Sequence, residues 1–401
     1  MYIIEFVLLS YFAYVSLYSF VLSIAGLYYR WPHAPQASFL RRVAVLIPAY
    51  KEDHVITGVA EQALRQNYPA DLFDVIVVAD SLKPSTLQKL RALPVRVIEV
   101  SFEKSTKVKA LNSAMTQLGE GYDCALILDA DNVMERNFIR KMNDLFDIGY
   151  SAIQARRDPK NENTSMAVLD GVSETINNFI YRQGNVALGL SSSLSGSGMM
   201  FDYAIFRDIL GRMDSIGGFD RELELRLLQH GIKVYFARDV VVYDEKVAND
   251  QVFERQRRRW ISSHFFYLRK YFNEGWRELM KGNVSFFNSA VLRNIQLPRL
   301  LNLGMLAGIV LLSIIFARYV TIHPIVWAAL FAMNIAAMLF AIPRRFYTLK
   351  LFKSVLLIPR LFLRMFLLLF RLKGANKNFI HTPHGRVTPQ AEVEIDYGKK
   401  L

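Results

Sequence analysis

The chain has 401 residues, of which 52% are hydrophobic, so it can hold one catalytic domain of roughly 200–250 residues together with membrane segments. Its formal net charge of +13 fits basic residues beside membrane spans and attraction to anionic lipid headgroups. No alternation of basic and aromatic residues of the kind that stacks bases is present, which argues against nucleic-acid binding, and the single cysteine, Cys124, excludes an internal disulfide.

The first apolar segment covers residues 6–29, carries no charge and is long enough for a helix that crosses a bilayer. Arg30, Arg41 and Arg42 follow it, whereas a signal peptide carries its basic residues first. We therefore expect residues 1–29 to form a transmembrane helix. By the positive-inside rule, the arginines place the next domain in the cytoplasm.

Short apolar runs alternate with helical stretches from Val43 onward, which predicts an α/β domain with a parallel sheet over residues 40–262. A helix is expected from about Ile56 to Gln66. The predicted strands are VAVLIP, DVIVVAD, VRVIEV, CALILDAD and YSAIQAR. Open sheets of this kind bind ligands at the carboxyl ends of their strands, so the polar residues there are the first candidates for a site.

The C-terminal part is apolar again. Interfacial helices are expected over residues 263–298, and two apolar stretches separated only by Arg318 predict a transmembrane hairpin over residues 299–343. The stretch 349–373 contains Lys353, Arg360, Arg364 and Arg371, which fall within about 40° of one another on a helix. A helix in the membrane interface fits this stripe better than a fourth span, although a span whose arginines face a polar conduit is the alternative.

One predicted strand ends in Asp129-Ala130-Asp131, two carboxylates separated by one residue. In an extended chain these side chains share a face and can hold one divalent ion. Oxygen ligands suit Mg²⁺ or Mn²⁺ better than zinc. Aspartates at strand ends also cap turns, so the two residues alone are weak evidence for a metal site and the surrounding motifs must support it.

That context is a series of motifs: in chain order, VAVLIPAYKE, VIVVADS, TKVKALN, LILDAD, SGSGMMF, FDRELELRLL and QRRRW. The series closely resembles membrane-bound family 2 glycosyltransferases, such as bacterial cellulose, hyaluronan and poly-N-acetylglucosamine synthases, over about residues 43–265. The resemblance implies an α/β, GT-A-like nucleotide-binding domain with a mixed, mainly parallel sheet, flanked by transmembrane and interfacial helices. It also implies an integral protein of a bacterial inner membrane with a cytoplasmic catalytic domain.

The resemblance implies donor-binding roles at the strand ends. Residues that would line the base and ribose pocket are Pro48, Ala49, Tyr50 and Glu52, and Asp80 would contact the nucleotide. Lys107 would face the donor diphosphate, unless it is a solvated surface lysine. Asp129 would lie near the nucleotide and sugar, and Asp129 and Asp131 would form the metal site, with Asp131 on the ion that bridges the diphosphate oxygens.

An acceptor hydroxyl needs a base, and the family supplies an aspartate. Here that position falls on Asp220, preceded by Phe219 where the family commonly has glutamate. This departure leaves Glu222 and Glu224 as rivals. Asp220 could alternatively cap a helix, a role that does not exclude catalysis.

Two further motifs are expected on the acceptor side. Gly196, Ser197 and Gly198 resemble the family's small-residue loop beside the acceptor, with an ordinary turn as the alternative. In QRRRW, the resemblance implies that Gln256 and Trp260 contact the acceptor and that Arg259 faces the diphosphate, whereas a basic patch on the membrane surface is the simpler explanation.

The tail, residues 374–401, contains a short match to a gating segment of related synthases, carried by Phe379, Thr382 and His384, with a disordered polar tail as the alternative. His381 and His384 lack a third ligand nearby, which argues against zinc.

We expect inverting transfer of a sugar from a nucleotide-diphosphate donor, with UDP favoured, to a growing polysaccharide. Single addition to a lipid-linked sugar is the alternative acceptor reaction. The order of motifs disfavours a hydrolase, and the spans lack the inverted repeats of a transporter. A catalytically silent scaffold, for which Phe219 is the hint, is the remaining alternative. With about three spans evident, a homo-oligomer or an exporter subunit would be needed to move a polymer.

Overall fold

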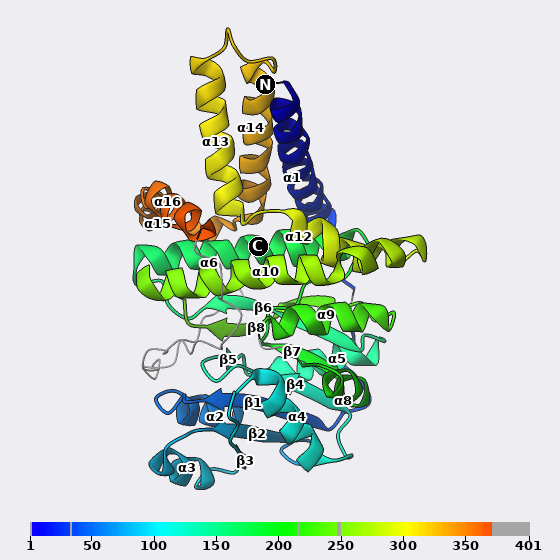
Figure 1. The fold of residues 1–401 in the computed structure, drawn as a ribbon. Helices are drawn as coiled ribbons and strands as arrows, with labels where there is room; N and C mark the ends of the chain where they lie inside the picture. The colour runs from blue at the N-terminus through cyan, green and yellow to red at the C-terminus, as the bar shows by residue number, and fades with distance from the viewer. Residues whose placement is uncertain (1, 33, 215–216, 247–249, 371–401) are drawn as a thin grey trace.

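The structure, a computed structural model, describes residues 2–32, 34–214, 217–246 and 250–370. Three helices stand upright at one end, two long helices lie across their base, and a twisted sheet with its own helices fills the other end (Figure 1). The upright helices are α1 (Tyr2–Tyr28), α13 (Arg299–Ile315) and α14 (Pro324–Ala341). The motifs singled out in the sequence lie in the sheet and in the helix layer above it.

The sheet has eight strands in the order β3-β2-β1-β4-β7-β6-β8-β5. Its strands are β1 (Val43–Tyr50), β2 (Phe73–Asp80), β3 (Arg96–Val100), β4 (Cys124–Ile127), β5 (Val133–Met134), β6 (Ala152–Pro159), β7 (Met199–Asp202) and β8 (Tyr235–Asp244). Neighbours pair in parallel except at β4/β7, β7/β6 and β8/β5. The predicted mixed, mainly parallel sheet is therefore confirmed, and all five predicted strands form.

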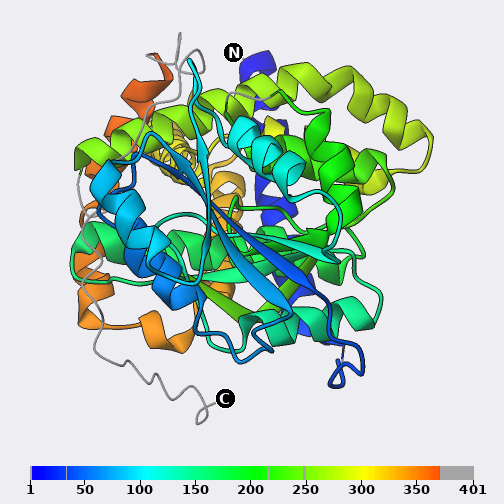
Figure 2. The ribbon, with the colours of Figure 1, turned by 90° about the horizontal axis from the view of Figure 1, so that it is seen from below.

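Helices pack on both faces of this sheet (Figure 2). The sequence of β1 is continuously apolar because both faces of the strand are buried: Val43, Val45 and Ile47 lie in one core, and Ala44 and Leu46 lie in the other. The first core is completed by α2 (Ile56–Ala63) and α5 (Phe138–Asp147), and the second by α4 (Lys107–Leu118), α8 (Tyr203–Gly211) and α9 (Phe219–Gln229). A further short helix, α3 (Pro84–Arg91), contacts α2 and β3.

The layer between sheet and upright helices consists of α6 (Ser165–Asn177) and α10 (Asp250–Met280) (Figure 1). A π-helical segment, Asn178–Gly184, continues α6 into α7 (Asn185–Ala187). After α10 come α11 (Val284–Phe287), a second π-helical segment, Asn288–Leu292, and α12 (Arg293–Ile295). Helix α10 runs unbroken through residue 262, so the helix layer and the catalytic domain share one rigid element.

Two described helices, α1 and α14, are long and apolar enough to cross a membrane. A third crossing results if Val284–Ile295 and Arg299–Ile315, which meet at 51°, form one broken span. Beyond α14, α15 (Leu349–Val355) and α16 (Ile358–Leu369) lie beside the base of the upright helices and not among them (Figure 1). This arrangement is compatible with an interfacial position for residues 349–370, which stays a prediction.

Candidate active site

The carboxyl ends of β1 and β2 lie side by side, with Tyr50 paired to Asp80. The next residues, Lys51 and Ser81, both adopt the left-handed backbone conformation, with φ of 56° and 57°. Such a conformation costs a residue with a side chain roughly 1–3 kcal/mol and is retained mainly at functional sites. The Lys51 amide donates to the Asp80 carbonyl at 3.0 Å, which ties the two strand ends together.

Residues expected to bind the nucleotide occupy this edge. Asp80 is buried and accepts a hydrogen bond from the Ser81 hydroxyl at 2.9 Å. Ala49 is buried, and Pro48, Tyr50 and Glu52 are half-buried. The structure thus brings these positions to one strand edge, while their contacts with a nucleotide stay predictions.

Asp129 and Lys107 meet at the next strand end. The Lys107 ammonium donates to Asp129 Oδ1 and, at 2.6 Å, to the Gly196 carbonyl. Both side chains are partly exposed, 21% for Lys107 and 34% for Asp129, so a ligand can reach them. Lys107 is the first residue of α4, and Thr106 caps that helix by accepting from the Lys109 amide. The lysine therefore projects from a fixed helix start and is not a solvated surface residue.

The small-residue loop holds the metal motif in place. The Ser197 hydroxyl is buried and accepts from the Asp129 amide at 2.9 Å and from the Asn132 side chain at 2.6 Å. Gly198 has a φ of 63°, and a Cβ atom there would lie 2.6 Å from Val242 Cγ1. Gly198 is therefore required by both backbone conformation and space. Glycine at 196, with a φ of 88°, lies directly beside the Asp129 carboxylate.

Asp220 lies in the first turn of α9, and its neighbour Phe219 contacts Lys107. The Phe219 ring lies 5.3 Å from the Lys107 ammonium, a cation–π contact where the family commonly has a carboxylate. Burial lowers the pKa of Arg259, while the charges of Asp220 and Asp129 counteract that shift. Arg259 is thus within electrostatic range of both carboxylates and connects the expected base to the expected donor site.

The two rivals of Asp220 are occupied by structural contacts. Glu222 accepts from Arg226 at 2.8 Å and from Lys270 at 3.3 Å. Glu224 is fully buried and accepts from the Ser289 hydroxyl at 2.6 Å and from Arg293 at 3.0 Å. Asp220 does not cap α9, because the N-cap position of that helix is occupied by Gly218.

The QRRRW motif lies on α10. Trp260 is 42% exposed, and the Arg257 guanidinium lies 4.4 Å from its ring centroid. Arg257 also donates to Asp170 at 2.5 Å, so this basic residue of the motif has a partner within the protein. Gln256 Oε1 is buried and has no hydrogen-bond partner among the described residues. The predicted gating residues Phe379, Thr382 and His384 lie outside the described residues.

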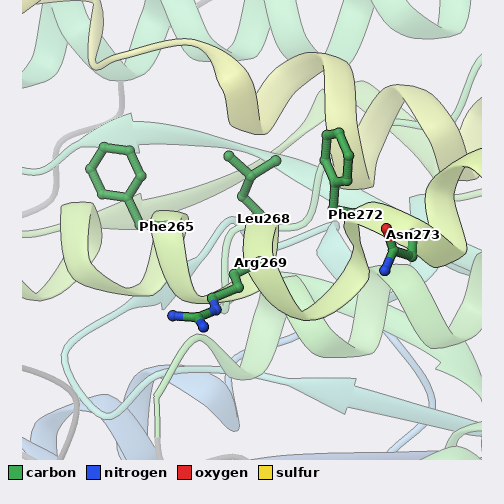
Figure 3. A pocket seen from close by; sticks show the side chains of 5 residues that line it. All are labelled: Phe265, Leu268, Arg269, Phe272 and Asn273. Carbon is green, nitrogen blue, oxygen red and sulfur yellow. The ribbon is translucent and has the colours of Figure 1, made fainter.

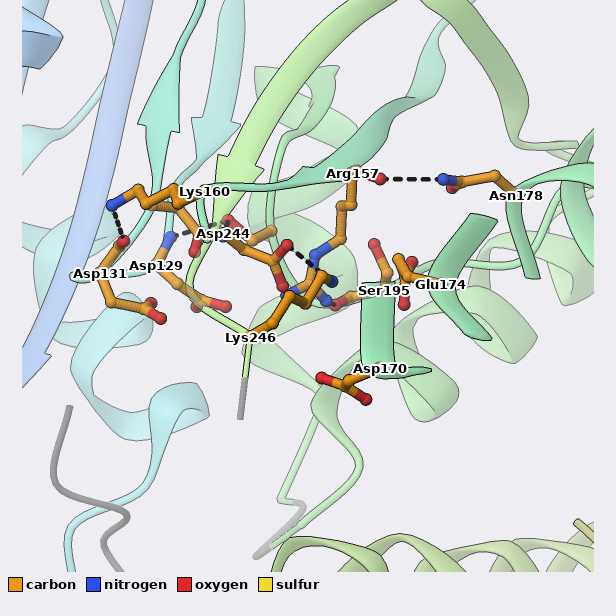
Figure 4. Close-up of polar contacts among 12 residues, drawn as sticks. Asp129, Asp131, Arg157, Lys160, Asp170, Glu174, Asn178, Ser195, Asp244 and Lys246 are labelled. Carbon is orange, nitrogen blue, oxygen red and sulfur yellow. Dashed lines mark hydrogen bonds and ion pairs between the residues drawn. The ribbon is translucent and has the colours of Figure 1, made fainter. Parts of the chain in front are cut away.

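Sequence reasoning missed a buried ionic network beneath the metal motif (Figure 4). Arg157 donates to the Ser195 carbonyl at 2.9 Å and to Asp244 at 2.5 Å, and Lys246 pairs with the same carboxylate at 2.8 Å. Lys160 donates to the Asp131 carbonyl. Arg157 and Lys160 come just after the predicted strand YSAIQAR. Their position at the carboxyl end of a strand, where open sheets bind ligands, could have marked them as candidates.

Carboxylate oxygens at the metal motif suit a hard divalent cation. Among the described residues, no three His, Cys, Asp or Glu side chains gather in a way that could hold a metal ion. Lys107 pairs with Asp129, and the charge of Asp131 acts on Lys160 and Arg157, so both carboxylates lie among cations. The pair fits a metal that takes its remaining oxygen ligands from a bound diphosphate.

The family model described as glycosyltransferase like family 2 matches residues 41–263, more than half of the chain. The chain belongs to glycosyltransferase family 2. The predicted family and enzyme class are therefore confirmed. This glycosyltransferase carries its family region between α1 and the C-terminal helices.

Relatives of this glycosyltransferase differ in their reported names. The beta-monoglucosyldiacylglycerol synthase of Synechocystis sp. is 25% identical over 238 residues, 56% of this chain and 48% of that protein. The probable glycosyltransferase YdaM of Bacillus subtilis is 22% identical over 244 residues, 58% of this chain and 57% of that protein. The chain spans only about half the length of these relatives.

Among solved structures, the mannosyltransferase PcManGT from Pyrobaculum calidifontis, in complex with GDP-Man and Mn²⁺, is similar with a TM-score of 0.52 and 17% identity. The match covers 88% of this chain and 96% of that protein. At this identity the likeness concerns the fold, and it confirms the predicted GT-A-like architecture.

Proposed function

We propose that this glycosyltransferase moves a sugar from a nucleotide-diphosphate donor to an acceptor held at the membrane, with inversion at the anomeric carbon. The observation that carries the proposal is the cluster at the strand ends, where the Lys107 ammonium contacts Asp129 Oδ1 and the Gly196 carbonyl and lies 5.3 Å from the ring of Phe219, the residue before Asp220. The expected diphosphate site and the helical turn that carries the expected base therefore lie side by side. Donor and acceptor groups within reach of one another are what direct displacement requires.

In the proposed reaction, Asp220 accepts the proton of the acceptor hydroxyl as the acceptor oxygen forms its bond to the anomeric carbon. The bond from that carbon to the diphosphate breaks, and the nucleoside diphosphate leaves with the electron pair. Lys107 and Arg259 balance the charge that develops on the leaving group. Mg²⁺ or Mn²⁺ at Asp131, with Asp129 beside it, would supply further positive charge to the diphosphate oxygens.

The acceptor has two candidates. A growing polysaccharide is favoured by the QRRRW motif. A lipid-linked sugar is favoured by the break between α12 and α13 at the base of the upright helices. The Arg293–Glu224 ion pair joins α12 to α9, so a lipid at the break would lie close to the helix that carries the expected base. The beta-monoglucosyldiacylglycerol synthase relative makes, by its name, a glycolipid, which also favours a lipid acceptor.

We also propose that α10 lies in the membrane interface. Phe265, Leu268, Arg269 and Phe272 lie around one shallow hollow on α10, with the Arg269 side chain turned away from the three apolar side chains (Figure 3). Phe265 and Phe272 are 37% and 40% exposed, as expected for side chains that meet lipid. This hollow contains none of the candidate catalytic residues, so it supports membrane placement and not a substrate site.

The test is a panel of radiolabelled sugar nucleotides offered to the purified protein in lipid, with Mg²⁺ or Mn²⁺. We expect label from one donor to enter acceptor material, which is separated into large polymer and organic-soluble lipid. Label in either fraction supports transfer and identifies the acceptor class. Free sugar as the sole product would contradict the proposal and indicate hydrolysis.

A further inference from the structure

The side of Asp220 that faces the upright helices is rich in buried arginine. Arg293 is 7% exposed, and its Nη2 donates to Glu224 Oε2 at 3.1 Å and lies 3.0 Å from Oε1 of the same carboxylate, an ion pair. Its Nε and Nη1 atoms are buried and lack a partner within the part of the chain that the structure describes. On α9, Arg221 donates to Asn294 at 2.6 Å.

Arg299 extends this group to the membrane boundary. Its Nη2 donates to the carbonyl and the hydroxyl of Ser173, at 2.8 and 3.1 Å. Its Nη1 is buried without a partner, and no carboxylate of the described ranges lies within ion-pair distance. Arg299 is also the first residue of α13, where the positive end of the helix dipole disfavours a cation. Glu174 acts on Arg299 only through its charge and is itself paired with Arg182, so this guanidinium has no direct ion pair among the described residues.

The three arginines belong to one environment. The Arg299 guanidinium lies 5.9 Å from the Tyr181 ring, and the Tyr181 ring lies 6.5 Å from that of Tyr18, whose hydroxyl donates to Asn288 in the segment that precedes Arg293. Burial and the neighbouring Arg293 lower the pKa of Arg221 to about 10, although Glu224 and Asp220 oppose that shift. The group therefore carries an excess of positive charge.

Irregular helical segments border this group on two sides. Tyr181 belongs to the π-helical segment Asn178–Gly184, and the segment Asn288–Leu292 directly precedes Arg293. Such segments are frequent at functional sites. Residues 297–300 are all partly exposed, and the chain bends by 51° there, at the base of the upright helices (Figure 1). A headgroup at the membrane surface can thus approach Arg299 from the break.

We propose that the acceptor is a lipid-linked substrate with a phosphate group, and that Arg299 and Arg293 bind this phosphate while Asp220 faces the acceptor hydroxyl. The inference rests on the proposed function and specifies its acceptor. Guanidinium groups without partners fit the several acceptor oxygens of a phosphate. A neutral glycolipid would leave the same groups unsatisfied at a cost.

The binding test compares octaprenyl phosphate with octaprenol, which differ only in the phosphate. Both are titrated into the purified protein in phosphatidylcholine nanodiscs, without any sugar nucleotide. We expect octaprenyl phosphate to bind at least about tenfold more tightly, because hydrogen bonds to charged groups contribute that much. Equal binding of the two lipids would overturn the proposal, whether or not the enzyme transfers sugar.

Arg299→Gln should remove most of this preference, and Arg299→Lys should retain part of it. Arg318→Gln is the matched control, because Arg318 is exposed in the loop between α13 and α14. Thermal unfolding of each variant separates loss of the site from loss of the fold. A preference that persists in folded Arg299→Gln protein would contradict the assignment of Arg299.

The activity test separates a substrate from a bilayer lipid. With a prenyl-diphosphate-linked sugar as acceptor, Arg299→Gln should raise KM for this acceptor about tenfold, whereas the control Arg318→Gln should leave it unchanged. With a monoglycosyl diacylglycerol, the same variant should behave as the unmodified protein. Displacement of octaprenyl phosphate by phosphatidylglycerol, without transfer to the phosphate-bearing acceptor, would assign the site to a membrane phospholipid and overturn the proposal.

Discussion

Three carboxylates in the first half of α9 differ in their surroundings. Asp220 faces the candidate site, while Glu222 and Glu224 are buried in ion pairs with Arg226 and Arg293. Removing one partner of a buried pair leaves an uncompensated charge and costs about 3–5 kcal/mol. The geometry therefore separates the candidate catalytic position from two positions in structural ion pairs within five residues.

Glu224→Gln should accordingly lower the free energy of unfolding by about 3–5 kcal/mol, since Arg293 loses its carboxylate. Asp220→Asn should change it by less than about 1 kcal/mol. Thermal unfolding of both variants in the same detergent measures the difference. A large loss of stability in Asp220→Asn would mean that Asp220 is a structural residue.

His264 gives a pH-dependent prediction. Burial and the charges of Arg221 and Arg293 lower the pKa of His264 from 6.5 to about 3, although hydrogen bonds to the backbone at Asn294 and Gln296 oppose the shift. The folded protein then disfavours the protonated imidazole, and the unfolded chain does not. Stability from this residue is present above about pH 6.5 and is lost as the pH falls towards 3.

The check is denaturant unfolding between pH 7 and pH 4 for the unmodified protein and for His264→Asn. The variant should show a shallower loss of stability across that interval, because asparagine has no proton to bind. Identical slopes would contradict the buried neutral state of His264.

At the scale of elements, the loop before β7 tests how the fold positions Asp129. Gly198→Ala forces a side chain into a backbone with φ of 63° and against Val242, at a cost of about 2–5 kcal/mol. Gly196→Ala carries the backbone strain without the clash, since its nearest neighbour, Asp129 Oδ2, is 4.0 Å away. Gly198→Ala should thus be the less stable of the two and should weaken donor binding more, as measured by thermal unfolding and nucleotide titration.

Packing between α13 and α16 provides a second matched pair. A Cβ at Gly304 would lie 2.2 Å from the Phe362 ring, whereas nothing lies within 4 Å of a Cβ at Gly308, one turn further along α13. Gly304→Ala should lower the stability in detergent by about 1–3 kcal/mol, and Gly308→Ala should leave it nearly unchanged. Equal effects would show that α16 does not pack against α13 at this point.

At the scale of the whole molecule, the sequence predicts the parallel part of the sheet because its strands are buried on both faces and appear as apolar runs. Strands β7 and β8, and the two-residue strand β5, were not predicted. Strand β7 follows glycines that suggested only a loop, and β8 contains Arg238 and Asp239 at the point where its pairing with β6 shifts register. Patterns of local sequence do not reveal a short antiparallel strand such as β7 or an irregular strand such as β8.

In the candidate site, too, some features could be predicted from the sequence and others could not. Lys107, Asp129 and Asp220 could be selected from motifs, because the chemistry needs those residue types at those positions. The pairing of Arg157 with Asp244 and of Arg299 with Ser173 could not, since the partners are 87 and 126 residues apart and meet only in the folded chain. Long-range contacts also decide which of the three α9 carboxylates remains available for catalysis.

The most direct test of the central claim is nucleoside diphosphate release by the purified protein in lipid, with Asp220→Asn beside the unmodified chain. General base catalysis contributes about 10²–10⁴-fold. We predict release from one sugar nucleotide that depends on the acceptor and falls at least about a hundredfold in Asp220→Asn, with donor affinity unchanged. Equal release by the variant, or no release from any donor despite intact nucleotide binding, would contradict the account.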